Sequence, residues 1–175
     1  PWQWLTAIIV LLRKPDVRKD RAIGLLTWLG RLWSRMRSHT AEVWAEQRSG
    51  PWDAAVRGNS ALREALLRVY ADEAALSSLL PEYCSASNCW DVEAFYDTIR
   101  WERVVAHALD LDFPAMCLAL EALLHMGPRL LRDAGTFAPP IIPKGGLVAG
   151  ARRAPDFAKC QMFSICQRAV DSSSL

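Results

Sequence analysis

The sequence predicts an α+β protein in which a small antiparallel sheet packs against several helices. Two apolar runs near the N-terminus can form a β-hairpin, and later apolar residues recur at the three- and four-residue steps of helices. Strands and helices interleave without the regular strand–helix–strand rhythm of a doubly wound sheet. With 175 residues, 51% of them hydrophobic, the chain has the size and composition of a single domain.

The N-terminal hairpin is the first expected element. The β-branched and apolar run in residues 5–12 predicts a strand. Pro15-Asp16 then favours a turn, and residues 21–24 supply the partner strand, which Gly24 ends.

Caps and breakers divide the rest of the chain. Ser60 has a side chain preferred at a helix N-cap, and Pro81 stops the helix that follows. The other expected elements are helices at 26–47, 102–109, 113–125 and 157–170, a helical turn at 95–99, a strand at 84–91, a hairpin of 129–131 with 136–142, and a frayed tail at 171–175.

Charge is concentrated in the first quarter of the chain. The net charge of +2 is too small to imply nucleic-acid binding by itself. A basic patch there would attract a phosphate backbone, although a solvated helix face explains the pattern equally well. The basic residues are Arg13, Lys14, Arg18, Lys19, Arg21, Arg31, Arg35 and Arg37.

The segment around Asp91 is the most informative. An apolar stretch leads into this residue, and Phe95, Tyr96 and Asp97 follow it. A carboxylate at the end of a buried strand is costly unless a cation meets it, and Mg²⁺ prefers oxygen ligands. Polymerases anchor their metals with such a carboxylate. Ending a strand or capping a helix is the commoner role of such a residue.

Two further segments suit phosphate and nucleic-acid contacts. Lys14 and Arg21 flank the hairpin turn and could bind phosphate oxygens, or could simply be solvated. The glycine-rich residues 143–151 would let the backbone approach a ligand or template strand, and the residues after Gly150 could open a helix. A flexible connector is the ordinary alternative for such a loop.

The order and spacing of these segments resemble the front part of a reverse transcriptase, most closely the non-LTR retrotransposon type. The motifs are a basic strand–turn–strand in 8–28, Asp-x-x-x-Phe-Tyr-Asp in 86–105 and a glycine loop entering a helix in 141–165. Two positions depart from the family. Ala149 stands where Gln is usual, and Pro155 would break a helix beyond its first turn.

The resemblance implies a partial right-hand polymerase, which is an RNA-directed DNA polymerase (a nucleotidyltransferase). Residues 1–83 would be fingers-like, and residues 84–170 palm-like. Its partners would be an RNA template, a DNA primer and a deoxynucleoside triphosphate. Each site residue has an implied role. Asp91 binds Mg²⁺ or Mn²⁺ together with the Val92 carbonyl, Tyr96 crowds a ribose 2′-hydroxyl, Lys14 and Arg21 contact the triphosphate, and Gly150 lies near the template and the nascent base pair.

One family motif does not occur in the 175 residues. The family has two adjacent aspartates on a hairpin after the glycine-loop helix, and no Asp-Asp pair precedes Leu175. Since Asp91 alone should not hold two metal ions, we expect a fragment that is inactive by itself. It begins with Pro1 rather than Met, which also suggests a fragment. The alternatives are a degenerate retroelement remnant that binds nucleic acid without catalysis, and a helical interaction domain with an accidental resemblance.

The remaining features point to an intracellular protein without a membrane span, in either nucleus or cytoplasm. The five cysteines are an odd number and no secretory signal is recognised, which suggests reduced thiols that mostly serve as small core residues. His107 and His125 lie in apolar helical patterns and are expected to be structural. The apolar run at 5–12 is much shorter than the roughly 20 residues that span a bilayer.

Overall fold

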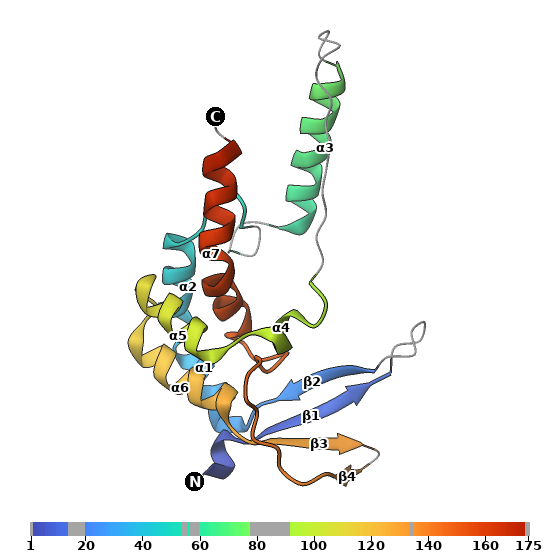
Figure 1. Cartoon of the computed structure of the whole chain (residues 1–175), viewed down its shortest axis with the longest axis vertical. Coiled ribbons are helices and arrows are strands. Elements are labelled where there is room, and N and C mark those ends of the chain that lie inside the picture. Colours follow the sequence, from blue (N-terminus) through green and yellow to red (C-terminus); the bar gives the residue numbers. More distant parts are fainter. Residues whose placement is uncertain are drawn as a thin grey trace.

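The computed structural model describes residues 2–13, 20–53, 56, 60–77, 92–133 and 135–173. These residues form an α+β fold with seven α-helices, one 3-10 helix and one four-stranded sheet (Figure 1). In chain order the elements are η1 Trp2–Leu5, β1 Ala7–Leu12, β2 Arg21–Leu25, α1 Trp28–Met36, α2 Ser38–Gln47, α3 Ala61–Ser77, α4 Phe95–Thr98, α5 Trp101–Asp110, α6 Ala115–Met126, β3 Arg129–Asp133, β4 Thr136–Phe137 and α7 Ala154–Ser173.

The sheet is mixed rather than antiparallel, with the strand order β2-β1-β3-β4. Its two outer pairs are antiparallel, which confirms both predicted hairpins. The central pair, β1 with β3, is parallel, so the expectation of a wholly antiparallel sheet was wrong. The reason is the connection: helices fill the long crossover between these strands, and a long crossover allows parallel pairing.

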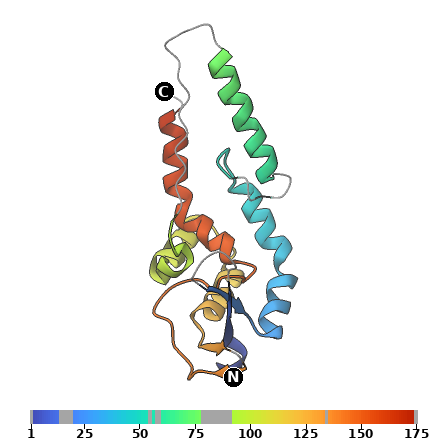
Figure 2. The ribbon, with the colours of Figure 1, turned by 90° about the vertical axis from the view of Figure 1, so that its right-hand side faces the viewer.

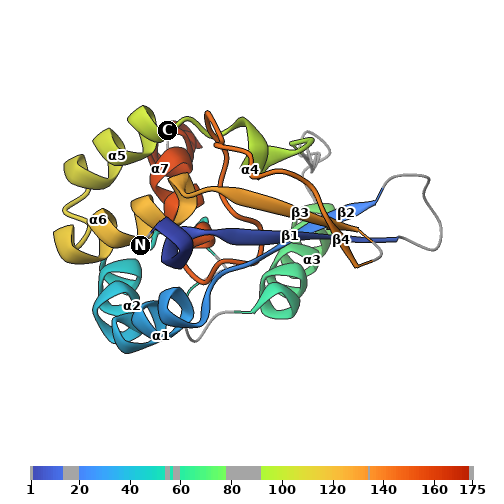
Figure 3. The ribbon, with the colours of Figure 1, turned by 90° about the horizontal axis from the view of Figure 1, so that it is seen from below.

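Helices α1, α2, α5 and α6 lie at one end of the strands, and the other end of the sheet extends away from them (Figure 3). Exposure along β1 follows this arrangement: Ala7 is 0% exposed at the helical end, whereas Leu12 is 48% exposed. The apolar core therefore lies where the sheet meets the helices.

Most predicted helices are present, with two differences in their bounds. The segment predicted as one helix at 26–47 is two helices that meet at Arg37. Helix α7 begins at Ala154, so Pro155 lies in its first turn, where the missing N–H is tolerated. The same helix continues through Ser173, into the tail that was expected to fray. Ser60 caps α3 as predicted, because its Oγ accepts the Arg63 N–H at 3.1 Å.

The core is centred on Phe157 of α7, which is 0% exposed. Its ring contacts the rings of Trp101, Phe113 and His125 at centroid distances of 5.9, 5.5 and 5.5 Å. Aromatic contacts of this kind add about 0.5–1.5 kcal/mol each beyond the area that they bury. Cys117 and Cys160 are buried free thiols, which confirms that they serve as core residues.

Helix α3 is placed differently from the others. It extends beyond the body of helices in both Figure 1 and Figure 2.

The predicted strand at 84–91 lies outside the described residues, and so does Asp91 at its end. No helix in the described part of the chain has the length and apolar character needed to span a membrane.

Candidate functional site

The site is organised by the loop between β4 and α7, and residues 144–151 are here called the glycine loop. One side of this loop is hydrogen-bonded to helix α4. The Leu147 N–H donates to the Tyr96 carbonyl at 2.7 Å, and the Gly146 N–H donates to the Ile99 carbonyl at 2.8 Å. A side chain at Gly146 would press on Asp97, since its Cβ would lie 3.2 Å from the Asp97 Cα. The loop and α4 are thus joined through their main chains.

The other side of the glycine loop is joined to strand β2. The Gly24 N–H donates to the Ala149 carbonyl at 2.7 Å. A Cβ on Gly24 would overlap the Val148 side chain, and a Cβ on Gly150 would lie 3.2 Å from the Gly24 carbonyl oxygen. Gly150 also has φ +97°, a left-handed conformation that favours glycine. Both glycines are therefore required for the contact between loop and strand.

The buried His125 and the nearby Arg129 are hydrogen-bonded to the glycine loop. His125 Nδ1 accepts the Val148 N–H at 2.9 Å, and Arg129 Nη2 donates to the Gly146 carbonyl at 2.8 Å. Burial, and to a lesser extent the Arg129 guanidinium, lower the pKa of His125 to about 3. The imidazole is therefore neutral at physiological pH and is free to accept at Nδ1. The structural role predicted for His125 is confirmed.

Tyr96 and Val92 flank the sharp turn that leads into α4. Ala94 makes this turn with φ +51°, which is uncommon for a residue other than glycine. Tyr96 is half-buried, with its ring centroid 5.8 Å from that of Phe95. Val92 is 52% exposed. The turn thus fixes the Tyr96 main chain on the glycine loop and leaves part of its ring accessible.

The residues expected to bind phosphate and metal are only partly described. Lys14 and Asp91 lie outside the described residues. The Arg21 main chain pairs with Leu12 at the start of β2, and its side chain is outside the described part. Gly24 follows Arg21 by three residue steps of extended strand, about 10 Å along β2. Among the described side chains, no group of three or more His, Cys, Asp or Glu could hold a metal ion.

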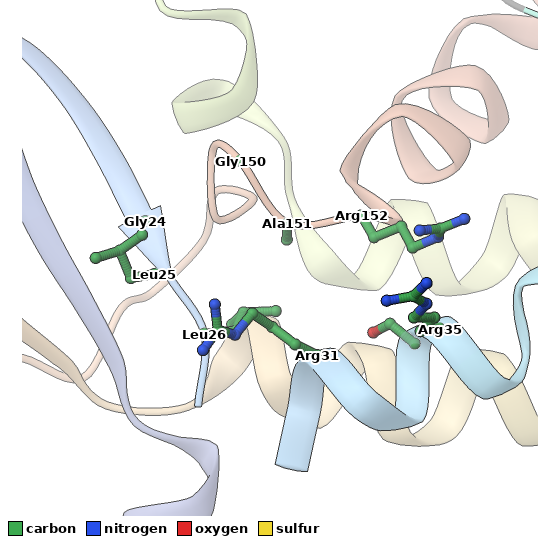
Figure 4. Close-up of a pocket in the computed structure, with 9 residues that line it drawn as sticks. Gly24, Leu25, Leu26, Arg31, Arg35, Gly150, Ala151 and Arg152 are labelled. Carbon is green, nitrogen blue, oxygen red and sulfur yellow. The ribbon is translucent and has the colours of Figure 1, made fainter. Parts of the chain in front are cut away.

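A pocket of about 360 Å³ lies where β2, α1 and the end of the glycine loop meet (Figure 4). Its charged side chains are Arg31 and Arg35 from α1 and Arg152 from the residue after the loop. Arg31 and Arg35 belong to the basic residues in the first quarter of the chain, whereas no role was expected for Arg152. Arg31 and Arg35 are four residues apart and so lie on one helix face. This spacing was the signal in the sequence that could have indicated a shared site.

Ser34 lines the same pocket and contacts a buried acid behind it. Its Oγ lies within hydrogen-bond distance of both the Gly30 carbonyl and Glu121 Oε1. Burial raises the pKa of Glu121, which is 1% exposed. The Gly30 carbonyl and Glu121 Oε1 thus compete for the single hydroxyl proton of Ser34.

No model of a known protein family matches the chain, and no curated protein matches it. The function is therefore inferred from the residues and their arrangement.

Proposed function

We propose that this chain is the fingers and first palm part of an RNA-directed DNA polymerase of the non-LTR retrotransposon type. The observation that supports the proposal best is the double attachment of the glycine loop. This loop bonds to β2 through Ala149 and to α4 through Leu147. Three segments that were chosen from the sequence as parts of one site are thus joined by main-chain hydrogen bonds.

The proposed chemistry is nucleotidyl transfer. In the complete enzyme the primer 3′-hydroxyl attacks the α-phosphorus of a deoxynucleoside triphosphate, a new P–O bond forms, and pyrophosphate leaves. Asp91, with the Val92 carbonyl, would hold Mg²⁺ or Mn²⁺, which supplies charge stabilisation for the triphosphate. Lys14 and Arg21 would neutralise phosphate charge from the hairpin.

Two described residues would select and position the substrates. The Tyr96 main chain is held by the glycine loop, and its half-buried side chain would exclude a 2′-hydroxyl by steric contact. Gly150 would lie beside the template. Its lack of a side chain already has a packing reason, the close approach to Gly24, so an effect of Gly150→Ala on activity would not by itself demonstrate template contact.

Binding of a fluorescent deoxynucleoside triphosphate with Mg²⁺ tests the proposed site in this chain. We expect Asp91→Asn to weaken binding about tenfold, equivalent to roughly 1.4 kcal/mol. The matched control is Asp110→Asn, because Asp110 is an exposed carboxylate at the end of α5. Equal affinities in wild type and Asp91→Asn would contradict the proposed role of Asp91.

Primer extension tests catalysis. The 175-residue chain should incorporate no nucleotide, because it has no Asp-Asp pair. Reading the coding sequence past Leu175 separates the alternatives. An Asp-Asp hairpin there predicts Mg²⁺-dependent extension by the longer protein, and Asp91→Asn should abolish it. A stop codon favours the degenerate remnant that binds nucleic acid without catalysis.

A further inference from the structure

Three arginine side chains line the pocket between α1 and the end of the glycine loop, and in Figure 4 Arg31 extends toward Leu26, away from Arg35 and Arg152. Arg31 and Arg35 are one helical turn apart, about 6 Å along α1. Figure 4 shows Arg35 and Arg152 extending from opposite walls toward the same space. Like charges gathered in this way repel one another unless an anion lies between them.

The acids around the pocket do not neutralise it. Arg152 pairs with Glu42 at 3.4 Å, and both side chains are about half exposed. Arg31 and Arg35 form no ion pair with any residue that the structure describes. Glu121 lies behind Ser34, and burial raises the pKa of its carboxyl group. The pocket thus has a surplus of positive charge and one buried hydroxyl in its lining.

A second hollow of about 330 Å³ continues from the pocket along α1. It is lined by Trp28, Arg31, Leu32 and Arg35, so both arginines border both hollows. The Trp28 ring is 66% exposed. Stacking aromatic rings beside guanidinium groups are the typical means of binding single-stranded nucleic acid. An acidic peptide would use the arginines but would leave the exposed indole without a role.

We propose that a single strand of nucleic acid lies along this face of α1, with its phosphates bound by Arg31, Arg35 and Arg152 and a base stacked on Trp28. The inference deepens the proposed function and rests on it only in taking nucleic acid as the partner. It names a path for an unpaired strand that begins at the glycine loop and leaves along α1.

The test is binding of a fluorescent 12-nucleotide RNA to the full 175-residue chain, without metal or triphosphate. Arg31→Gln and Arg35→Gln should each weaken binding about 3- to 10-fold at 0.1 M salt. Each should also lower the slope of log affinity against log salt by about 0.7. Trp28→Ala should weaken binding about tenfold with an unchanged salt slope. The matched control is Arg103→Gln, an exposed arginine on α5 that borders neither hollow and should change affinity less than about twofold.

Other occupants give different results. Displacement of the RNA by inorganic pyrophosphate at a similar phosphate concentration would overturn the proposal in favour of a small-anion site. Equal, arginine-dependent affinity for a glutamate-rich peptide would overturn it in favour of an acidic protein partner. A triple variant of Arg31, Arg35 and Arg152 that keeps wild-type RNA affinity would overturn it outright. Because the assay contains neither Mg²⁺ nor triphosphate, failure of the Asp91 test leaves this result unaffected, and the reverse also holds.

Discussion

The two longest helices, α3 and α7, have similar apolar contents but very different surroundings. Helix α7 buries Ala154, Phe157 and Cys160 against the other helices. Helix α3 buries none of its described side chains, and Tyr70 and Leu76 are 68% and 74% exposed. Helical periodicity therefore predicts that a helix forms, but whether its apolar side is covered depends on elements far away in the sequence.

Removing the central buried side chain of α7 should give the largest difference in stability between the two helices. Phe157→Ala should destabilise the chain by about 3–5 kcal/mol, because it removes a fully buried ring and its three aromatic contacts. Tyr70→Ala on α3 is the matched control and should stay within about 0.5 kcal/mol. Urea unfolding measures both. Similar losses for the two variants would show that α3 is packed in solution.

A pair of glycines extends the contrast between packed and open regions to loops. Gly150 and Gly135 both have positive φ, +97° and +88°. A Cβ at Gly150 would press on the Gly24 carbonyl, whereas a Cβ at Gly135 would meet nothing within 4 Å. Gly150→Ala should therefore cost about 2–3 kcal/mol and Gly135→Ala about 1–2 kcal/mol, as thermal unfolding can measure. Equal costs would mean that the loop-to-strand contact gives way easily.

His125 gives the packed region a dependence on pH. Its pKa is about 3 in the folded chain, against an ordinary value of 6.5. Between these values the unfolded chain binds more protons, so stability should be full above pH 6.5 and fall as the pH drops. The loss should reach about 2 kcal/mol at pH 5. His125→Asn keeps an acceptor for the Val148 N–H and should flatten this profile.

The matched control is His39→Asn, on the exposed surface of α2. It should leave the pH dependence of urea unfolding as in the wild type. An unchanged profile in His125→Asn would contradict the buried, neutral state of that imidazole.

The smallest effect is expected on α3. Leu66 is 51% exposed, so Leu66→Lys should change the free energy of unfolding by less than about 0.5 kcal/mol. It should nevertheless raise the solubility limit of the purified chain, because it interrupts exposed apolar surface. A large loss of stability would show that Leu66 is covered in solution.

Local signals in the sequence predicted much of the fold. The turn residues after β1 predicted the hairpin, and Ser60 predicted the start of α3. The break at Arg37 was missed, because neither Gly nor Pro marks it. The parallel pairing of β1 with β3 was also missed, since it joins strands far apart in the chain and has no local signature.

The candidate site was predictable in its parts but not in its assembly. Tyr96 and Gly150 were chosen from the resemblance to a polymerase family, and the glycine loop, which contains Gly150, is hydrogen-bonded to the Tyr96 carbonyl. Gly24 was interpreted only as the end of a strand, although it is the contact point for Ala149. The approach of Arg152 to Arg31 and Arg35 depends on tertiary structure alone, and no sequence pattern links them.

The parallel pair at the centre of the sheet has a consequence during synthesis. The ribosome releases β1 well before β3, its partner on one edge, because the intervening helices are synthesised between them. Until then that edge has unpaired main-chain groups, which invite association with other nascent chains. Closing such a long loop is also slow. Chaperone binding to the nascent N-terminal hairpin should therefore persist until translation has passed β3.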